Sequence, residues 1–311
     1  MSNNISYTPE EVAQILKISR FTVYEFIKRG HLTAYHIGRK LRIEATDLEK
    51  YMNNAKGTER LTPQLTTHPI NAPVGIQDAL IIYGQDATLD VLTRHLAKKM
   101  PHVRFLRCYA GSMDGLFALY HGTANLVTTH LWDGDTDDYN TPYVRRLLPG
   151  QRALVINLVY RQEGLYVPPG NPKNITDWSD LTQPGLRFIN RERGSGVRIL
   201  LDEKFRKLNI DPRSIQGYDQ EETSHLAIAS YVARGEADVG IGIEKAAMQV
   251  HNLDFIPLQK ERYDLVLLRQ DKDKPQFQAL LSTLRSPAFR DEIAGMGGYD
   301  VSHMGNLMAE V

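Results

Sequence analysis

The sequence predicts an α/β protein with a small N-terminal domain and a larger body made of two lobes. Three observations support this prediction. The chain has 311 residues, more than one typical domain contains. Residues 57–75 are rich in Thr, Pro and Gly and lack apolar periodicity, which indicates a linker between residues 1–56 and residues 76–311. In the last segment, short apolar runs alternate with amphipathic helices, the pattern of an open parallel sheet.

Charge divides the chain at the same place. The formal net charge is zero, but residues 1–56 carry nine basic and six acidic side chains, which leaves the remainder at −3. A basic N-terminal domain favours nucleic acid as its partner. Cys108 is the only cysteine, which excludes an intramolecular disulfide and a cysteine-based zinc site. The N-terminus has no signal-peptide pattern and no apolar run is long enough to span a membrane, so we expect a soluble cytoplasmic protein.

The N-terminal domain begins with two short helices. Thr8 as N-cap, Pro9 at the first helical position and Glu11 form a capping box for the first helix. Ser19 is placed to cap a second helix, which Gly30 would end. Two helices separated by two or three residues predict a helix-turn-helix.

A hairpin and a further helix complete this domain. Two extended runs surround the basic sequence 38–40, Gly-Arg-Lys, and a capping box from Thr46 to Glu49 predicts the last helix. We expect DNA contacts near the start of the second helix and in the hairpin. The alternative is an ordinary solvated basic face. The predicted DNA-binding residues are Arg20, Thr22, Tyr24, Lys28, Arg39, Lys40 and Arg42.

Nearly all of residues 7–52 carry a known pattern: T-P-E-E-V-A, S-x-x-T-V-Y, R-G-x-L-x-A, G-R-K-x-R-I and D-L-E-x-Y. The segment closely resembles the excisionase-type DNA-binding domain, a winged relative of the MerR-like helix-turn-helix. This resemblance implies binding to double-stranded DNA. Such domains usually work in pairs on two half-sites, so we expect a homodimer or a higher homo-oligomer.

The first half of the body predicts three strands, at residues 79–84, 103–109 and 124–130, each followed or preceded by a helical segment. In open α/β sheets, ligands gather at the carboxyl ends of the strands, where helix N-termini point their free N–H groups. The polar residues predicted at these ends to bind ligand are Gln85, Asp86, Ser112, Thr128 and Thr129.

The rest of the body predicts a second α/β lobe between two extended crossings, at residues 153–172 and 254–269. We place lobe 1 at about 76–157 and 266–311, and lobe 2 at about 158–265. The C-terminal helices are expected to close lobe 1. Two α/β lobes joined by two crossings describe a binding protein that encloses its ligand between them.

Several motifs in the body support a family resemblance. They are G-N-P after the first crossing, N-R-x-x-G-S-G-x-R-x-L-L-D, E-E-T-x-H-L-A, G-x-A-D-V-G-x-G-I and E-R-Y-D-L-V. The body resembles the type II periplasmic-binding-protein fold, and more narrowly the version attached to helix-turn-helix domains and to molybdenum-cofactor biosynthesis enzymes. The resemblance implies a small anionic ligand, molybdate or tungstate, or a metabolite related to that cofactor.

The sequence R-E-R-G-S-G-V-R, residues 191–198, predicts an anion-binding loop at a helix N-terminus. Gly194 and Gly196 allow close backbone approach, and Ser195 offers its hydroxyl. Arg191, Arg193 and Arg198 could each supply planar donors, but helical geometry will not point all three inward, and we favour Arg193 and Arg198. The alternative is a glycine-rich helix cap whose arginines pair with nearby carboxylates. Glu222 and Tyr263 complete the predicted ligand site.

Carboxylates at the expected cleft, Asp86, Asp133, Glu221 and Glu222, would oppose a bare dianion. Either they pair with Arg193 or Arg198, or the ligand is larger and has its own donors, as a pterin does.

No catalytic or metal motif is found. The histidines lack the H-E-x-x-H spacing, and the sequence has neither a G-x-S-x-G elbow nor a phosphate loop. We therefore predict no enzyme activity, metal or cofactor, and a one-component transcriptional regulator whose ligand closes the lobes. The alternatives are an enzyme or cofactor-handling domain of molybdenum-cofactor metabolism tethered to DNA, and a constitutive DNA-binding protein with a vestigial cleft.

Overall fold

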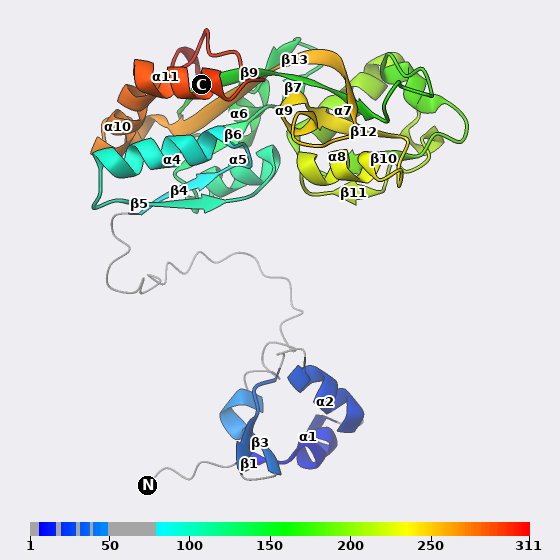
Figure 1. Ribbon diagram of the computed structural model, residues 1–311. Coiled ribbons are helices and arrows are strands. Elements are labelled where there is room, and N and C mark those ends of the chain that lie inside the picture. Colours follow the sequence, from blue (N-terminus) through cyan, green and yellow to red (C-terminus); the bar gives the residue numbers. More distant parts are fainter. Residues whose placement is uncertain (1–5, 17–19, 29–31, 38–39, 49–78) are drawn as a thin grey trace. The chain divides into compact units, whose positions relative to one another are not determined.

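The chain forms two compact units, residues 1–70 and 71–311, which are described separately. The computed structural model describes residues 6–16, 20–28, 32–37, 40–48 and 79–311 (Figure 1). The predicted linker, 57–75, lies outside the described residues, as do Ser19, Gly30, Arg39 and Glu49.

The first unit begins with the predicted helices, α1 (Pro9–Leu16) and α2 (Arg20–Lys28). The capping box is confirmed: the Thr8 N–H donates to Glu11 Oε2 at 2.7 Å, and the Glu11 N–H donates to Thr8 Oγ1 at 3.2 Å. These bonds satisfy two of the N–H groups that a helix start leaves without partners. The two helices and the strands share a small apolar core of Val12, Ala13, Val23, Leu32, Ile43 and Leu48.

The predicted hairpin is confirmed by strands β2 (Tyr35–Ile37) and β3 (Lys40–Glu44), which pair antiparallel. A short strand that we did not predict, β1 (Ser6–Tyr7), pairs with the other edge of β3. The third helix starts at residue 45, so Thr46 is already helical and is not the cap we expected.

In the second unit, three parallel strands and two helices follow the predicted order. They are β4 (Ala79–Tyr83), α4 (Thr88–Lys99), β5 (Arg104–Cys108), α5 (Ser112–Tyr120) and β6 (Leu126–Thr129). They belong to a nine-stranded sheet with the order β11-β10-β12-β9-β13-β6-β4-β5, in which β14 (Leu307–Glu310) also pairs with β9. Figure 1 shows this sheet running through both lobes of the unit.

The two long crossings are β9 (Ala153–Val167) and β13 (Asp254–Leu268), each 15 residues long and paired antiparallel along their length. They carry the chain between the lobes, as predicted. Helices α10 (Pro275–Leu284) and α11 (Pro287–Gly295) pack on α4 and close lobe 1. Lobe 2 contains β10 (Phe188–Arg191), α7 (Gly196–Leu208), β11 (Glu221–Glu222), α8 (His225–Ala233), β12 (Val239–Ile243) and α9 (Glu244–Ala247). Three short 3-10 helices span Trp178–Thr182, Pro212–Ser214 and Arg269–Asp271.

One excursion departs from the prediction. The hairpin of β7 (Trp132–Asp133) and β8 (Asp138–Tyr139) lies within the range that we assigned to lobe 1, but its aromatic side chains are buried in the core of lobe 2. Lys204 Nζ lies 3.9 Å from the Trp132 ring centroid and fixes the hairpin to α7. The chain then returns to lobe 1 through α6 (Thr141–Leu147). The assignment of residues 76–157 to lobe 1 is therefore wrong for this hairpin, because burial of two aromatic rings outweighs chain continuity.

None of the helices in the described part of the chain is long and apolar enough to cross a membrane.

Candidate ligand-binding site between the two lobes

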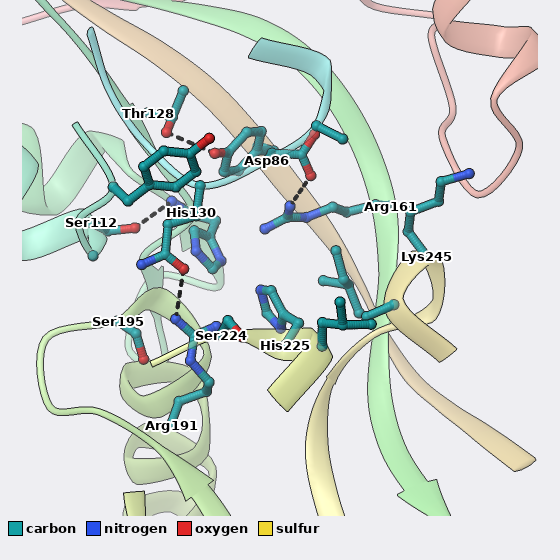
Figure 2. Close-up of a pocket in the computed structure, with 18 of the residues that line it drawn as sticks. Asp86, Ser112, Thr128, His130, Arg161, Arg191, Ser195, Ser224, His225 and Lys245 are labelled. Carbon is teal, nitrogen blue, oxygen red and sulfur yellow. Dashed lines mark hydrogen bonds and ion pairs between the residues drawn. The ribbon is translucent and has the colours of Figure 1, made fainter. Parts of the chain in front are cut away.

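A cavity of about 410 Å³ lies in the second unit and is lined from both lobes. Three serines mark helix starts on its wall: Ser112 is the first residue of α5, and Ser195 and Ser224 are the N-caps of α7 and α8. The N-terminus of a helix carries partial positive charge and free N–H groups, so these three helix ends favour an anion in the cavity. Figure 2 shows Ser112 on one side of the cavity, and Ser195 and Ser224 on the other.

Arg161, from the middle of β9, supplies the first cation. Its side chain is almost fully buried, and its Nη1 donates to Asp86 Oδ2 at 2.5 Å while its Nε donates to Glu261 Oε1. The guanidinium also stacks on Tyr263, 4.1 Å from the ring centroid. Its Nη2 has no hydrogen-bond acceptor among the described residues, although Arg161 lines the cavity.

Arg191, the last residue of β10, supplies the second cation. Glu192 holds it through two bonds, from Nε at 2.7 Å and from Nη2 at 2.8 Å. The same Nη2 reaches across to lobe 1 and donates to Gln85 Oε1 at 3.1 Å. Nη1 has no acceptor within the part of the chain that the structure describes. Each of the two arginines thus keeps one nitrogen for a ligand.

Two histidines line the cavity between these arginines (Figure 2). His130 Nδ1 lies 2.6 Å from Glu261 Oε2, and burial lowers its pKa although Glu261 opposes this effect. Burial and the charges of Arg191 and Arg161 hold the pKa of His225 well below its ordinary value of 6.5. His225 is therefore neutral at pH 7, and its Nδ1 has no partner among the described residues.

Contacts between the lobes surround the cavity. The Met113 N–H at the start of α5 donates to the Gly194 carbonyl at 3.1 Å, next to Ser195. On the opposite side, Lys245 Nζ donates to the Met296 carbonyl in the segment after α11. Together with the bond between Arg191 and Gln85, these contacts join the two lobes across the cavity.

The structure brings half of the predicted ligand residues to the cavity. Tyr263 donates its hydroxyl to Thr128 Oγ1 at 2.7 Å, and burial raises the pKa of this phenol to about 12, so both side chains remain neutral. Asp86 is not an unpaired carboxylate, because Arg161 and the Tyr299 hydroxyl, at 3.1 Å, both donate to it. The predicted residues that line the cavity are Gln85, Asp86, Ser112, Thr128, Ser195 and Tyr263.

The two arginines that we favoured lie elsewhere. The side chain of Arg193 is 76% exposed and faces Asp219, so it does not reach the cavity. Arg198 is buried, but it lies in the first turn of α7 and its guanidinium pairs with Asp202 at 3.1 Å and Glu221 at 2.8 Å. The predicted pairing of Glu221 with Arg198 is present, but the cavity arginine of this loop is Arg191.

The other predicted residues surround the site without lining it. Thr129 is fully buried and follows Thr128 on a strand, so its side chain points to the other face of the sheet. Gly194 and Gly196 flank Ser195 and lie close to lobe 1, Gly194 beside Met113 and Gly196 beside His130. A Cβ atom on Gly196 would lie 2.5 Å from the His130 ring. Glu222 pairs with β10 at the edge of the sheet.

Sequence reasoning ranked Arg191 behind Arg193 and Arg198, and it missed several other lining residues, Arg161, His130, Thr223, Ser224, His225, Lys245 and Tyr299. One signal was available for the first of these: Arg161 interrupts the apolar run of the crossing 153–172. A charged side chain within a buried strand needs a partner, and this marks it as a candidate for a site.

The predicted DNA-binding residues lie on α2 and the hairpin. Arg20 and Tyr24 are exposed on α2, and Arg20 Nη1 lies 4.0 Å from Glu10 Oε1. Arg42 is half-buried on β3, opposite Tyr35. Thr22, Lys28 and Lys40 lie in the same elements, at positions whose side chains are not described, and Arg39 lies outside the described residues.

These features define a class of protein: a helix-turn-helix domain joined to a two-lobed α/β body with a cavity between its lobes. The chain belongs to the PBP superfamily, because residues 93–285 match the PBP superfamily domain; residues 6–56 match a helix-turn-helix domain. Both are binding domains, and no catalytic family is indicated.

The chain is 40% identical over 317 residues to the protein YvgK of Bacillus subtilis (strain 168), and the match covers all of both chains. It is 55% identical over 113 residues to a Clostridium pasteurianum protein encoded in the 5′ region of a 2Fe-2S ferredoxin gene, which covers 36% of this chain and all of that one.

Two solved structures share the fold. A putative phosphate ABC transporter substrate-binding protein with bound phosphate, from Clostridium perfringens, has a TM-score of 0.53 and 15% identity, covering 71% of this chain and 98% of that one. The sulfate-binding protein SubI of Mycobacterium tuberculosis has a TM-score of 0.52 and 17% identity, covering 71% and 85%.

Proposed function

We propose that this protein is a one-component transcriptional regulator that binds DNA through its helix-turn-helix domain and senses a small anion in the cavity of its body. The proposed ligand is molybdate or tungstate, or an anionic metabolite related to the molybdenum cofactor. The observation that carries this proposal is the pair of free guanidinium nitrogens, Arg161 Nη2 and Arg191 Nη1, beside three helix N-termini. Planar guanidinium donors and helix ends both favour oxyanions.

The charges beside the two arginines are compatible with a small oxyanion such as molybdate and with a larger anionic metabolite. Asp86 is paired with Arg161 and Glu192 is paired with Arg191, so neither of these two carboxylates is left unpaired beside the guanidinium groups. The cavity has a volume of about 410 Å³. A tetrahedral oxyanion would share this space with water, whereas a pterin-sized metabolite would fill more of it.

A ligand between the lobes would favour the closed arrangement. Arg161 lies on a crossing strand and Arg191 lies in lobe 2, so an anion that binds both can do so only when they face each other across the cavity. Closure then changes the orientation of the body to which each DNA-binding domain is attached. For a dimer on two half-sites, such a change alters DNA affinity.

The test is a ligand screen followed by matched variants. Both tryptophans, Trp132 and Trp178, lie in the body, so their fluorescence reports unfolding of the ligand-binding unit alone. We expect molybdate, tungstate or a pterin carboxylate at 100 times its dissociation constant to stabilise this unit by about 2.7 kcal/mol. Arg191→Met should abolish this shift, and Arg193→Met should leave it unchanged because that side chain is exposed.

DNA binding is measured in parallel by fluorescence anisotropy, with a duplex selected from a random-sequence library. The active ligand should change the affinity of the wild-type protein for this duplex and have no effect on Arg191→Met. The proposal fails if no oxyanion or pterin stabilises the body, or if Arg193→Met loses the response and Arg191→Met keeps it.

A further inference from the structure

A second cluster of chemically active side chains lies at the floor of the cavity. A ring nitrogen of His130 and one carboxylate oxygen each from Glu163 and Glu261 lie within 4.8 Å of one another. The three residues come from separate segments, after β6, on β9 and on β13. Glu163 and Glu261 have no exposed surface, and His130 is 8% exposed.

Glu163 lies fully buried beside the Glu261 carboxylate. Both of its carboxylate oxygens are buried and neither accepts a bond from a described donor. A buried polar group without a partner is costly and calls for an explanation, such as a proton or a bound ion.

The charges around this cluster do not balance. Three buried carboxylates, those of Asp86, Glu163 and Glu261, surround one buried guanidinium, that of Arg161. The next cation, Arg191, is already paired with Glu192. With His130 neutral and Glu163 ionised, the group lacks two positive charges, which either two protons or one divalent cation would supply.

We propose that His130, Glu163 and Glu261 bind one divalent transition-metal ion, of the Zn²⁺ or Mn²⁺ kind. One imidazole nitrogen with two carboxylate oxygens is a donor set that suits these ions. The bond from Arg161 Nε to Glu261 Oε1 would orient the second carboxylate from outside the coordination shell, the usual place for such a partner. A metal would replace the proton between His130 Nδ1 and Glu261 Oε2, now 2.6 Å apart, and these atoms would separate by roughly 1 Å to reach ordinary metal–ligand distances.

The position of the cluster links the metal to the ligand site. His130 and Arg161 both line the cavity, and Arg161 also donates to Glu261, so a metal bound to the cluster would add positive charge beside the proposed ligand site. This link rests on the proposed function, whereas the metal site itself does not depend on it.

The experiment uses the full chain after removal of metal with a chelator. Calorimetric titration with Zn²⁺ and with Mn²⁺ should give one site per chain, and Co²⁺ bound there should show a visible absorption band of nitrogen and oxygen ligands. Glu163→Gln should weaken the affinity at least about 100-fold, because loss of even an outer-shell partner costs 10- to 100-fold. The control, Glu236→Gln, removes an exposed carboxylate paired with Arg234 and should bind metal as wild type does.

His130→Gln is the second variant and should also abolish the site and the Co²⁺ band. The tryptophan fluorescence of each variant checks that the body is folded. The proposal is overturned if no ion binds, or if Glu163→Gln and His130→Gln bind it as tightly as Glu236→Gln does. The oxyanion screen repeated in chelator separates the two proposals, since a failed metal site leaves the anion response in place and a failed anion screen leaves the metal stoichiometry in place.

Discussion

Removal of the Arg161 guanidinium should destabilise the body more than any other single change at its surface or cavity wall. Arg161→Met keeps most of the apolar stem and removes the charge that pairs with Asp86 and Glu261. Breaking a buried pair on one side costs about 3–5 kcal/mol, because the remaining charges stay buried without a partner. Since domains are stable by only about 5–15 kcal/mol, this is a large part of the total.

The measurement is urea unfolding at pH 7.5 in the presence of chelator, followed by tryptophan fluorescence, which reports only on the body. With a urea dependence of about 2–3 kcal/mol per molar, a loss of about 4 kcal/mol lowers the midpoint by roughly 1.3–2 M. Arg193→Met is the matched control. Its guanidinium is 76% exposed and faces an exposed Asp219, so its midpoint should match that of the wild type.

A double-mutant cycle shows whether the loss is electrostatic. If unpaired carboxylates cause it, Arg161→Met combined with Glu261→Gln should be less destabilised than the sum of the two single variants, because one buried charge has been removed with its partner. A loss below about 1 kcal/mol for Arg161→Met, or strict additivity in the cycle, would contradict the assignment of Arg161 as the counter-charge of the cavity floor.

Three further predictions follow from individual contacts. Gly196→Ala would place a methyl group 2.5 Å from the His130 ring, so it should lower both the melting temperature and the oxyanion affinity, whereas Gly295→Ala, with open space around it, should change neither. Burial holds the pKa of His225 well below 6.5. At mildly acidic pH, His225 therefore binds a proton in the unfolded chain but stays neutral in the folded chain. Stability should therefore fall as the pH drops below about 6.5, by up to about 1.4 kcal/mol per pH unit, and His225→Gln should reduce this slope in urea unfolding. Arg20→Ala should weaken DNA binding at every salt concentration and reduce the slope of log affinity against log salt by about one, as measured by anisotropy.

The local features of the fold could be predicted because each depends on neighbouring residues. The strands β4, β5 and β6 lie within the apolar runs that predict them, and the capping box of Thr8 and Glu11 forms the two bonds expected from its spacing. Both crossings were recognisable from their length. Ser195 caps α7 at the expected position, with its Oγ accepting the N–H three residues ahead.

The choice between Arg191 and Arg193 could not be made from the sequence. Arg191 is the last residue of β10, where the pairing with β11 and β12 fixes its direction toward the cavity. Two residues later the chain has left the sheet, and Gly194 adopts a φ of +86°, so Arg193 lies on the outside of a turn. The sequence shows three arginines in eight residues. It does not show that the strand ends at Arg191, because the pairing of β10 with β11 decides where the strand ends.

The cluster of His130, Glu163 and Glu261 depends on an irregularity that no periodicity shows. The pairing of β13 with β9 shifts register between Pro257 and Gln259 and again between Tyr263 and Asp264. Each shift changes which face of the sheet the following side chains occupy, so alternation counted along β13 fails on both sides of Glu261. Irregularities of this kind are frequent beside functional sites, and here they lie on either side of the residue that contacts both Arg161 and His130.

The same two strands therefore carry both the connection between the lobes and the charges of the cavity floor. Arg161 and Glu261 are directly paired partners on β9 and β13, whereas Asp86 belongs to lobe 1 and Arg191 to lobe 2. A change of charge at the floor, by an anion, a metal ion or a proton, would act on the two strands that connect the lobes. A ligand shifts a conformational equilibrium only through its different affinity for the two states. In this protein that difference would arise where Arg191 of lobe 2 comes to face Arg161 across the closed cavity.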